Sequence, residues 1–461
     1  MASSDDPAHR EGRYDRRELL RKAGAGAVGV GVAGSGFGQA FYGPLRFKGR
    51  WLKGDLSLIT WVHFVPSFDT WLDKTWAVQW GRKNDVQVNI DHVLNTLLLA
   101  RAQSEAAARS GHDIFFDLAP RPQFEDQVIN HKEIVQEVQR KVGKIGRIAH
   151  KATYNPKTKK YFAFSDNYVP DPVVWRHDYW ADAGFTPYTW DNVRKAAPKL
   201  KAAGHPLGIG MSQEIDSSMA LQSFMMCFGS FVQNSRHQVT LKSKRTVEAL
   251  RFMADIYQRG ETDEIFGWDP AGNNNFLYSG KGSLIFNAIS ATRTPEDRSL
   301  PFADQLWIWP VPKGPHGRLG YEHVMGVWWI WKFAKNKAAA KKFLADLEIN
   351  YDDAFMASKF YNFPSFPGAM PFKRVRRAVA ADKHRPRGKY SILATIAQKY
   401  TVNPGYPGYT NAAYGEMFAK FIIPTMFAQV AQKKMTAQEA VNAADREIKA
   451  IYRKWRRLGK I

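Results

Sequence analysis

The chain contains a single cysteine among its 461 residues, Cys227, which lies in the apolar run 224–228. One cysteine cannot form an internal disulfide, and no second thiol is present to build a metal cluster with it. Its position far from the N-terminus also excludes lipid attachment at a cysteine that follows a cleaved signal. The motifs His-Glu-x-x-His and Gly-x-Ser-x-Gly are missing as well. The sequence therefore predicts no metal site and carries no hydrolase signature.

Charged residues are absent between positions 23 and 45, where Gly, Ala and Val dominate, directly behind the basic run that contains Arg16 and Arg17. A basic head before a weakly apolar segment is typical of an export peptide, and the adjacent arginine pair indicates the twin-arginine route. The glycines weaken helix formation and lower the hydrophobicity, which disfavours a stable membrane span. We therefore predict a twin-arginine export signal over residues 1–45 and a periplasmic location. No convincing Ala-x-Ala cleavage site follows, so an uncleaved N-terminal anchor and a flexible tail stay open as alternatives.

The same stretch fits the dinucleotide-binding pattern Gly-x-Gly-x-x-Gly twice, at residues 24–29 and 29–34. A functional fingerprint of this kind follows a strand and opens a helix inside a βαβ unit. Here the pattern follows an arginine-rich polar head instead. We assign it to the signal and predict no cofactor.

Acidic residues are scarce, with 43 Asp and Glu against 66 Lys and Arg, which gives a formal net charge of +23. Such an excess raises the question of nucleic-acid or anionic-surface binding. Export removes most access to nucleic acid and no recognition module is visible, so no nucleic-acid partner is predicted. The excess is partly local: residues 371–389 carry eight Lys and Arg and one Asp. We hypothesise that this basic segment forms an added surface loop against anionic lipid or a membrane permease.

Strand and helix patterns alternate along the first third of the mature chain. Apolar strand-like runs at 56–61, 86–90 and 113–117 enclose helical patterns at 68–82 and 97–109. This order indicates a doubly wound α/β domain. A second region begins near residue 167, and from residue 337 onward the pattern is mostly helical. Its further elements are expected as helices at 190–203 and 246–259 and strands at 283–287, 306–311 and 325–331.

Several segments then occur in a recognisable order. They are Tyr161–Asn167, Trp175–Gly184 with Thr189-Trp190-Asp191, Phe276–Asn287, and Pro310–Pro315 with Lys335–Ala340. Together they resemble family 1 extracellular solute-binding proteins, the group that contains the maltose-type periplasmic receptors of ABC importers. The resemblance covers most of residues 55–350, and the basic segment 371–389 departs from it.

The resemblance implies an α/β, two-lobed periplasmic-binding-protein fold. Each lobe would hold a mainly parallel sheet flanked by helices, with a hinged cleft between the lobes. The implied boundaries are 55–166 plus 304–345 for lobe 1 and 167–303 plus 346–461 for lobe 2. It further implies a substrate-binding component that captures a small ligand by hinge closure and delivers it to an ABC importer permease in the inner membrane. No reaction is expected of such a receptor, so the protein is predicted not to be an enzyme.

Sugar recognition needs aromatic faces against the ring and planar polar groups for the hydroxyls, and α/β sheets bind ligands at strand ends. Trp61 and His63 follow the first strand, Asp117 and Arg121 follow the third, and Trp268 stands in a Gly/Asn/Pro-rich loop where it has no core to fill. The resemblance adds Asn167 and Tyr168 at the hinge crossing and Asn287 after the Gly-Lys-Gly turn. It also adds Glu322 and His323, which precede the strand expected to begin at Met325. The predicted ligand-binding residues are Trp61, His63, Asp117, Arg121, Asn167, Tyr168, Trp268, Asn287, Glu322 and His323.

The predicted ligand is a neutral mono- or oligosaccharide, from the abundance of aromatic residues and from the resemblance. A phosphorylated or anionic polyol is the competing interpretation, which Arg121 and the positive charge of the chain would suit. The rival function is a secreted carbohydrate-active hydrolase, in which Asp117 and Glu322 would form the carboxylate pair that glycoside hydrolysis requires.

Overall fold

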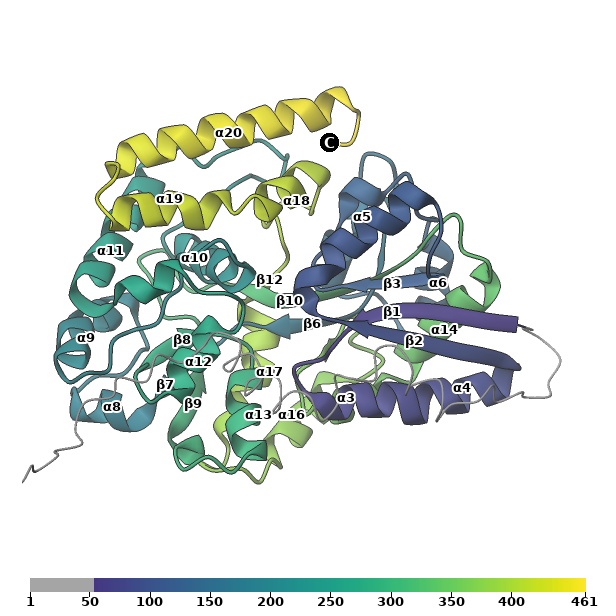
Figure 1. The fold of residues 1–461 in the computed structure, drawn as a ribbon, viewed down its shortest axis with the longest axis horizontal. Coiled ribbons are helices and arrows are strands. Elements are labelled where there is room, and N and C mark those ends of the chain that lie inside the picture. The colour runs from purple at the N-terminus through teal and green to yellow at the C-terminus, as the bar shows by residue number, and fades with distance from the viewer. Residues whose placement is uncertain (1–53) are drawn as a thin grey trace, which may run out of the picture.

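A seven-stranded mixed sheet forms the centre of the first lobe in the computed structural model, which describes residues 54–461 (Figure 1). The predicted signal over residues 1–45 lies outside the described residues. The strand order is β11-β6-β10-β3-β1-β2, with β12 paired to β10. β1 runs parallel to β2 and β3, whereas β10 runs antiparallel to β3 and β6. The strands are β1 (Gly54–Trp61), β2 (Val86–Val93), β3 (Ile114–Asp117), β6 (Phe164–Pro170), β10 (Gly320–Ile330), β11 (Phe363–Pro364) and β12 (Thr401–Val402).

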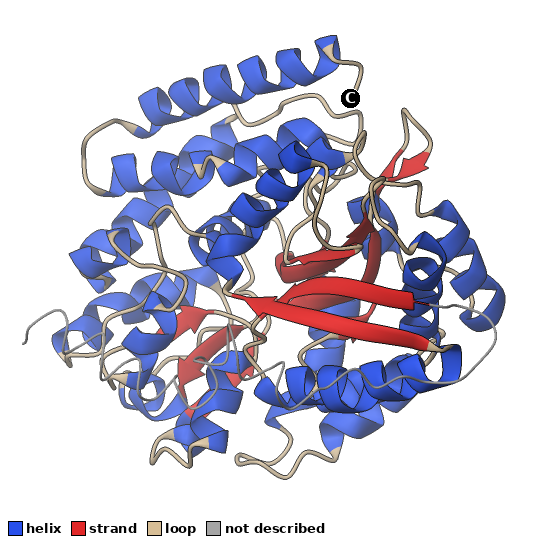
Figure 2. Cartoon of the chain, turned by 45° about the vertical axis from the view of Figure 1, so that its right-hand side comes forward, coloured by secondary structure: helices blue, strands red, loops and turns tan. Residues whose placement is uncertain are grey.

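Helices cover both faces of this sheet (Figures 1 and 2). The predicted helix 68–82 is present as α3 and α4 joined by a π-helical turn at 72–76, and the predicted helix 97–109 is α5. The core is strongly aromatic: the Trp329 ring on β10 stacks on Phe115 of β3 at 4.8 Å between centroids. The helices are α3 (Pro66–Trp71), α4 (Ala77–Asn84), α5 (Leu98–Ala108), α6 (Lys132–Val142), α7 (Arg147–Thr153), α14 (Lys337–Ile349) and α15 (Tyr351–Ala357), and a hairpin of β4 (Tyr154–Asn155) and β5 (Lys160–Tyr161) follows α7.

The second lobe is built on a three-stranded sheet of order β8-β7-β9 and is mostly helical. Its helix starts follow the sequence signals: Thr189 caps α9 by accepting from the Asn192 backbone N–H at 3.1 Å, and Thr436 and Glu439 form a capping box on α20. The elements are β7 (Val173–Arg176), α8 (His177–Asp182), α9 (Trp190–Ala202), α10 (Ile215–Cys227), α11 (Lys244–Gly260), α12 (Gly272–Tyr278), β8 (Leu284–Phe286), α13 (Ser290–Asp297), β9 (Leu306–Trp309), α16 (Phe372–Ala380), α17 (Leu393–Thr395), α18 (Ala412–Ala419), α19 (Ile422–Ala431) and α20 (Ala437–Arg457).

The expectation of a mainly parallel sheet in each lobe is wrong for the second lobe. β7 pairs antiparallel with both of its neighbours, β8 and β9. The chain enters β7 directly from β6 across the hinge, and this central strand therefore runs against the two strands that return to it later. Hydrophobic periodicity reports that a segment is a strand and which face it buries, but it carries no information on strand direction.

The lobe boundaries stay a prediction, and two segments pack otherwise than expected. β9, expected in lobe 1, pairs with β7 of the second lobe. Residues 346–357, expected in lobe 2, pack in the buried cluster that contains β1 and β3, and α15 contacts α3. Both segments flank points where the chain crosses between the lobes. A short apolar stretch there can pack into the core of either lobe, and only the three-dimensional path of the chain determines which one it joins.

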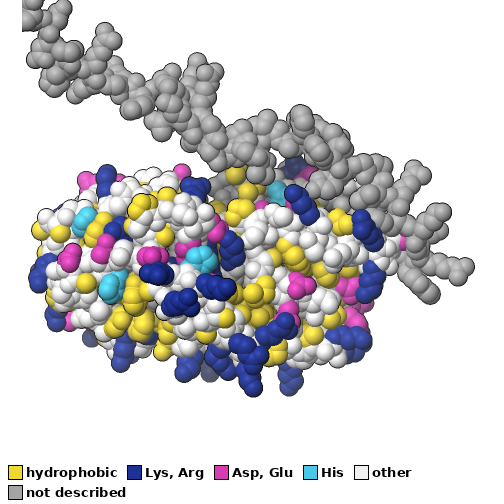
Figure 3. Space-filling view, turned by 90° about the horizontal axis from the view of Figure 1, so that it is seen from below, with side chains coloured by type: hydrophobic (Ala, Val, Ile, Leu, Met, Phe, Trp, Pro, Cys, Tyr) yellow, Lys and Arg dark blue, Asp and Glu magenta, His cyan; other side chains and the backbone are white. Residues whose placement is uncertain are grey.

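The basic segment 371–389 is a helix followed by an anchored loop. α16 buries Val375 and Val379 and leaves its basic side chains exposed. Lys and Arg side chains gather on the face of the molecule seen from below, the side on which α16 lies (Figure 3). Asp382 and Lys389 turn inward to Arg293 and Glu296 of α13. The segment is therefore part of the fold, and its role is better tested by reversing exposed charges than by deletion.

No helix within residues 54–461 combines the length and the apolar character needed to cross a bilayer.

The Glu261 carboxyl, at the C-terminal end of α11, is expected to make stability fall with rising pH. Burial raises its pKa to about 8, against the opposing hydrogen bond from the Ile209 N–H at 2.7 Å. The folded state therefore keeps the proton while the unfolded chain ionises, so its contribution to stability is present below about pH 4.5 and is lost as pH rises to about 8. Glu261→Gln should remove a decline of a few kcal/mol, at roughly 1.4 kcal/mol per pKa unit. Urea unfolding between pH 4.5 and 8.5 measures it; exposed Glu248→Gln on α11 is the control, and an unchanged pH slope in Glu261→Gln contradicts the expectation.

Candidate functional site

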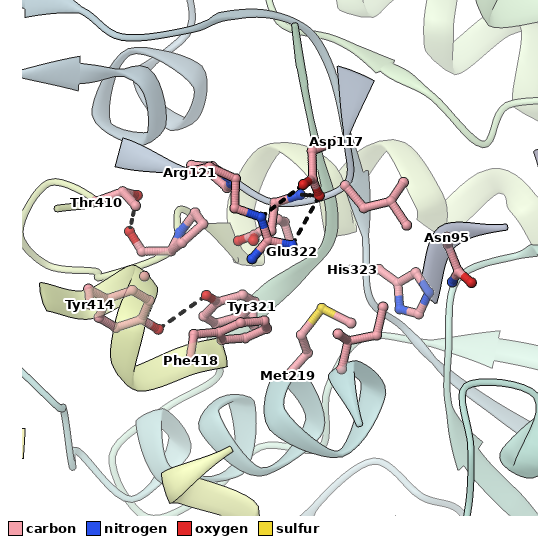
Figure 4. A pocket seen from close by; sticks show the side chains of 16 residues that line it. Asn95, Asp117, Arg121, Met219, Tyr321, Glu322, His323, Thr410, Tyr414 and Phe418 are labelled. Carbon is pink, nitrogen blue, oxygen red and sulfur yellow. Dashed lines mark hydrogen bonds and ion pairs between the residues drawn. The ribbon is translucent and has the colours of Figure 1, made fainter. Parts of the chain in front are cut away.

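A pocket opens between the two lobes at the carboxyl end of β3 (Figure 4). The first lobe contributes the strand end and the turn 117–121, and β10 crosses the back of the pocket as it connects the lobes. The second lobe contributes α10, the loop 404–410 and α18. The lining residues are Asn95, Asp117, Leu118, Ala119, Pro120, Arg121, Ile215, Met219, Tyr321, Glu322, His323, Pro404, Thr410, Tyr414, Gly415 and Phe418.

Asp117 and Arg121 form a two-pronged ion pair at one side of the pocket. Arg121 donates from Nε to one carboxylate oxygen at 2.9 Å and from Nη2 to the other at 3.1 Å. The Asp117 side chain is 1% exposed and that of Arg121 is 11% exposed. Because both carboxylate oxygens hold the guanidinium, Arg121 is neutralised by its own chain. Arg121 is therefore less suited to bind an anionic polyol than a free arginine would be.

Glu322 and His323 come from adjacent positions on β10, where a register shift in the pairing with β6 lies between Glu322 and Val324. Both residues line the pocket, and each is 3% exposed. Burial raises the pKa of Glu322 well above its usual value, with a further contribution from the nearby Asp171 charge. Its Oε2 atom has no hydrogen-bond partner in the described structure. The Glu322 carboxyl therefore faces the pocket with unused hydrogen-bonding capacity.

His323 connects the pocket to buried carboxylates behind it. Its Nδ1 lies 3.2 Å from Oδ1 of Asp171. Burial opposes the charged imidazolium, but the Asp216 charge and the Asp171 hydrogen bond outweigh it and raise the pKa of His323. Asp216 in turn accepts from Asn273 at 2.8 Å and from Asn287 at 3.2 Å. Asn287 thus holds Asp216 in position and does not itself line the pocket.

Trp61 and His63 pack together beyond the end of β1, away from the pocket lining. The His63 ring lies 4.8 Å from the Trp61 ring and 5.0 Å from that of Tyr361, centroid to centroid. Burial lowers the pKa of His63 to about 3, although a hydrogen-bond contact with Asn362 opposes this shift. His63 is therefore a neutral histidine inside an aromatic cluster.

Three other predicted residues also lie outside the pocket lining. Asn167 on β6 donates to Asp166 at 2.8 Å, and the Tyr168 hydroxyl donates to the Ala397 carbonyl at 3.3 Å. Trp268 is half-buried against Phe276, 5.2 Å between ring centroids. Of the ten predicted residues, the structure brings Asp117, Arg121, Glu322 and His323 together in the pocket and places the other six elsewhere.

The aromatic side of the pocket was missed by the sequence reasoning. Tyr321 stacks on Phe418 with ring centroids 6.0 Å apart, and the Tyr414 hydroxyl donates to that of Tyr321 at 3.1 Å. Tyr414 and Phe418 are one helical turn apart on α18, which Asn411 caps by accepting from the Tyr414 N–H at 2.9 Å. The one signal in this region was the Pro/Gly/aromatic interruption at 403–409, which supplies the loop before α18.

The pocket thus combines aromatic faces with planar polar groups and carboxylates. Within residues 54–461 no group of three or more His, Cys, Asp or Glu side chains is arranged to hold a metal ion. The geometry suits a small polar ligand that is held by stacking and hydrogen bonds.

Comparison with known sequences matches residues 66–359 to the bacterial extracellular solute-binding protein family. No curated protein matches the chain closely enough to count as a relative.

Solved structures share the fold at low identity. The maltose-bound MalE3 of T. maritima is 17% identical, with a TM-score of 0.70 over 86% of this chain and 100% of that one. The GacH receptor of Streptomyces glaucescens, solved unliganded and with acarbose, is 16% identical, with a TM-score of 0.69 over 87% and 98%. A sugar transporter from Arthrobacter chlorophenolicus with bound laminaribiose is also 16% identical, with a TM-score of 0.69 over 86% and 99%.

Proposed function

Because this chain belongs to the bacterial extracellular solute-binding proteins, we propose that it is the substrate-binding component of an ABC importer and that its ligand is a carbohydrate. The observation that carries the proposal is the inter-lobe pocket, in which Tyr321, Tyr414 and Phe418 face Asp117, Arg121 and Glu322. Aromatic faces pack against the C–H faces of sugar rings, and planar polar groups bind the hydroxyls. The fold-sharing proteins above were solved with maltose, acarbose and laminaribiose, which supports the same ligand class.

Hinge closure would couple binding to delivery. The lobes contribute opposite walls of the pocket, so a ligand that touches both walls makes some of its contacts only when the lobes are closed. Hinge segments would lie in the short link between β6 and β7 and in the longer connection, residues 310–319, between β9 and β10. The closed form would then dock on a permease in the inner membrane.

Export through the twin-arginine route to the periplasm completes the proposal. The family membership supports an exported protein, and Arg16 and Arg17 support the route. Fusion of residues 1–53 to a reporter that is active only after export tests it: Arg16→Lys with Arg17→Lys should abolish export, and unchanged export would contradict the twin-arginine assignment.

A sugar that binds in the pocket is expected to raise the melting temperature of the purified protein in a carbohydrate panel. A ligand at a hundred times its Kd stabilises the folded state by about 2.7 kcal/mol. Phe418→Leu, which removes the ring that stacks on Tyr321, should weaken binding about tenfold or more, because a lost stacking contact and its buried area together cost roughly 1–2 kcal/mol. Tyr188→Leu, an exposed aromatic of the second lobe outside the pocket, is the matched control and should leave binding unchanged. If no sugar changes the melting temperature, the proposed ligand class is wrong.

The alternative, a carbohydrate-active hydrolase, retains one supporting observation: Asp117 and Glu322 line the same pocket. Asp117, however, is held by Arg121 on both oxygens, which leaves it poorly placed to act as a nucleophile or base. Incubation with an oligosaccharide that binds, followed by chromatography of the products, distinguishes the two. Intact sugar supports a receptor, and cleavage that is lost in Glu322→Gln would establish the hydrolase instead.

A further inference from the structure

Acidic side chains cluster at the back of the pocket, although the chain as a whole is basic. Glu322 lines the pocket, and Asp171 and Asp216 lie behind it within range of His323. Asp117 on the pocket wall is cancelled by Arg121. Three carboxyl groups then remain against one imidazole in a protein of net charge +23. Burial raises the pKa of all three, so a further cation beside them is needed to stabilise their ionised forms.

Two of these carboxylates are incompletely bonded. Oε2 of Glu322 and Oδ2 of Asp171 are buried and have no hydrogen-bond partner in the described structure. Glu322 is 3% exposed and lines the pocket, so a ligand there can reach this side chain and a small rotation would bring its unpaired oxygen to the ligand. Buried carboxylates without partners are costly, and an incoming donor that carries positive charge relieves both the charge and the missing bond.

The other groups around Glu322 do not supply that donor. The Tyr414 hydroxyl donates to Gln222 and to Tyr321, Nδ1 of His323 lies 3.2 Å from Asp171, and Arg121 is held by Asp117. None of these groups donates to Glu322. The buried oxygens without a partner at this end of the pocket belong to Glu322 and Asp171, and a cationic donor is the ligand group that matches them best.

We propose that the pocket selects a saccharide that bears a protonated amine, with Glu322 as the direct acceptor and Asp171 and Asp216 as the charges behind it. This rests on the proposed function, because it names the class of sugar that the same site takes. A sugar hydroxyl also bonds to a carboxyl, but a charge-assisted bond to an ammonium is about twice as strong as a neutral one. An anionic sugar is disfavoured by the same carboxylates.

The experiment is isothermal titration of three disaccharides that share one β-1,4-linked glucose backbone and differ at position 2: cellobiose, its diamino form and its diacetylamino form. The comparison is repeated with glucose, galactose and mannose and their 2-amino forms, and with glucose 6-phosphate. In whichever of the two sets binds to the pocket, we expect the amine form to bind at least tenfold tighter than its neutral counterpart. Glu322→Gln should reduce that preference to less than threefold. Glu264→Gln, an exposed acid outside the pocket, is the control and should keep the full preference.

The outcomes separate the inference from the proposed function. A neutral or phosphorylated sugar that binds as tightly as its amine form, or tighter, overturns the inference and leaves the sugar receptor standing. No binding of any sugar overturns the proposed function, and binding of a diamine such as putrescine in its place would refute the sugar as well. The wild-type comparison needs no variant, so it stays decisive even if Glu322→Gln does not fold. Asp171→Asn then serves as the second variant, with the same expected loss of preference.

Discussion

Arg293→Met is expected to lower the free energy of unfolding by about 3–5 kcal/mol, the range for breaking one partner out of a buried ion pair. The Arg293 side chain is 2% exposed and lies 2.8 Å from Oε2 of Glu296 and 2.8 Å from Oδ2 of Asp382. It also donates from Nε to the Lys359 carbonyl at 3.2 Å, and its guanidinium carbon lies 3.9 Å from the centre of the Tyr390 ring. Methionine fills similar volume but removes the cation that the carboxylates of Glu296 and Asp382 share, and leaves Lys389 as the buried cation beside Glu296.

The measurement for Arg293→Met is urea unfolding followed by circular dichroism at neutral pH. Arg377→Met is the matched control, because Arg377 is an exposed arginine on α16, the helix just before Asp382. Its loss should change stability by less than about 0.5 kcal/mol, as is usual for exposed sites. The network ties α13 to the basic segment, so Arg293→Met should also increase cleavage of residues 381–389 by trypsin. A loss of stability below 1 kcal/mol would show that Lys389 alone neutralises the two carboxylates.

Arg121→Met is expected to cost about 3 kcal/mol, since it leaves the carboxylate of Asp117 buried without its cation. The expected cost is at the lower end of the range for a broken buried pair because Arg121 is itself partly exposed and the pocket admits water. Adding Asp117→Asn should restore at least 1 kcal/mol, because the double variant no longer buries a charge. The coupling obtained from the two single variants and the double variant measures the pair directly.

Arg140→Met is the control for Arg121→Met. Arg140 pairs with Glu137 on α6, where both side chains are exposed, at 70% and 40%. Surface pairs of this kind contribute about 0–1 kcal/mol, so this variant should be close to wild type. Equal losses in Arg121→Met and Arg140→Met would mean that the pocket pair is solvated like a surface pair, and that Arg121 is free to bind an anion after all.

The order of elements was predictable because it depends on local patterns. Buried runs such as Ile114–Asp117 and the helix start at Thr189 carry their signals within a few residues, and the structure confirms both. The two-lobed fold followed from ordered motifs over residues 55–350, and the family match over residues 66–359 confirms it. The antiparallel pairing of β7 was not predictable, since strand direction depends on the path of the chain across the hinge.

The candidate site divides in the same way. Asp117 and Arg121 were predicted from their place at the carboxyl end of a strand, and Glu322 and His323 from the family resemblance. All four line the pocket, although Glu322 and His323 lie within β10 and not before it as expected. Tyr414 and Phe418 lie nearly 300 residues from Asp117 and occupy a helix whose pattern reads as core. Trp61 and His63 also follow a strand, yet the packing of Tyr361 against them closes that strand end to form an aromatic cluster.

The sequence by itself determined the family and the succession of helices and strands, because both depend on residue type and spacing along the chain. It also predicts the export signal, on the same kind of evidence. Only the tertiary structure decided which strand ends open onto the pocket and which are filled. It also paired Arg121 with Asp117 and left Oε2 of Glu322 without a hydrogen-bond partner, and the net charge of the chain indicates neither of these. The physical reason is that solvent and salt screen exposed charges within about 10 Å, whereas buried groups a few ångströms apart are screened far less, so the neighbours of a group outweigh the net charge of the whole protein.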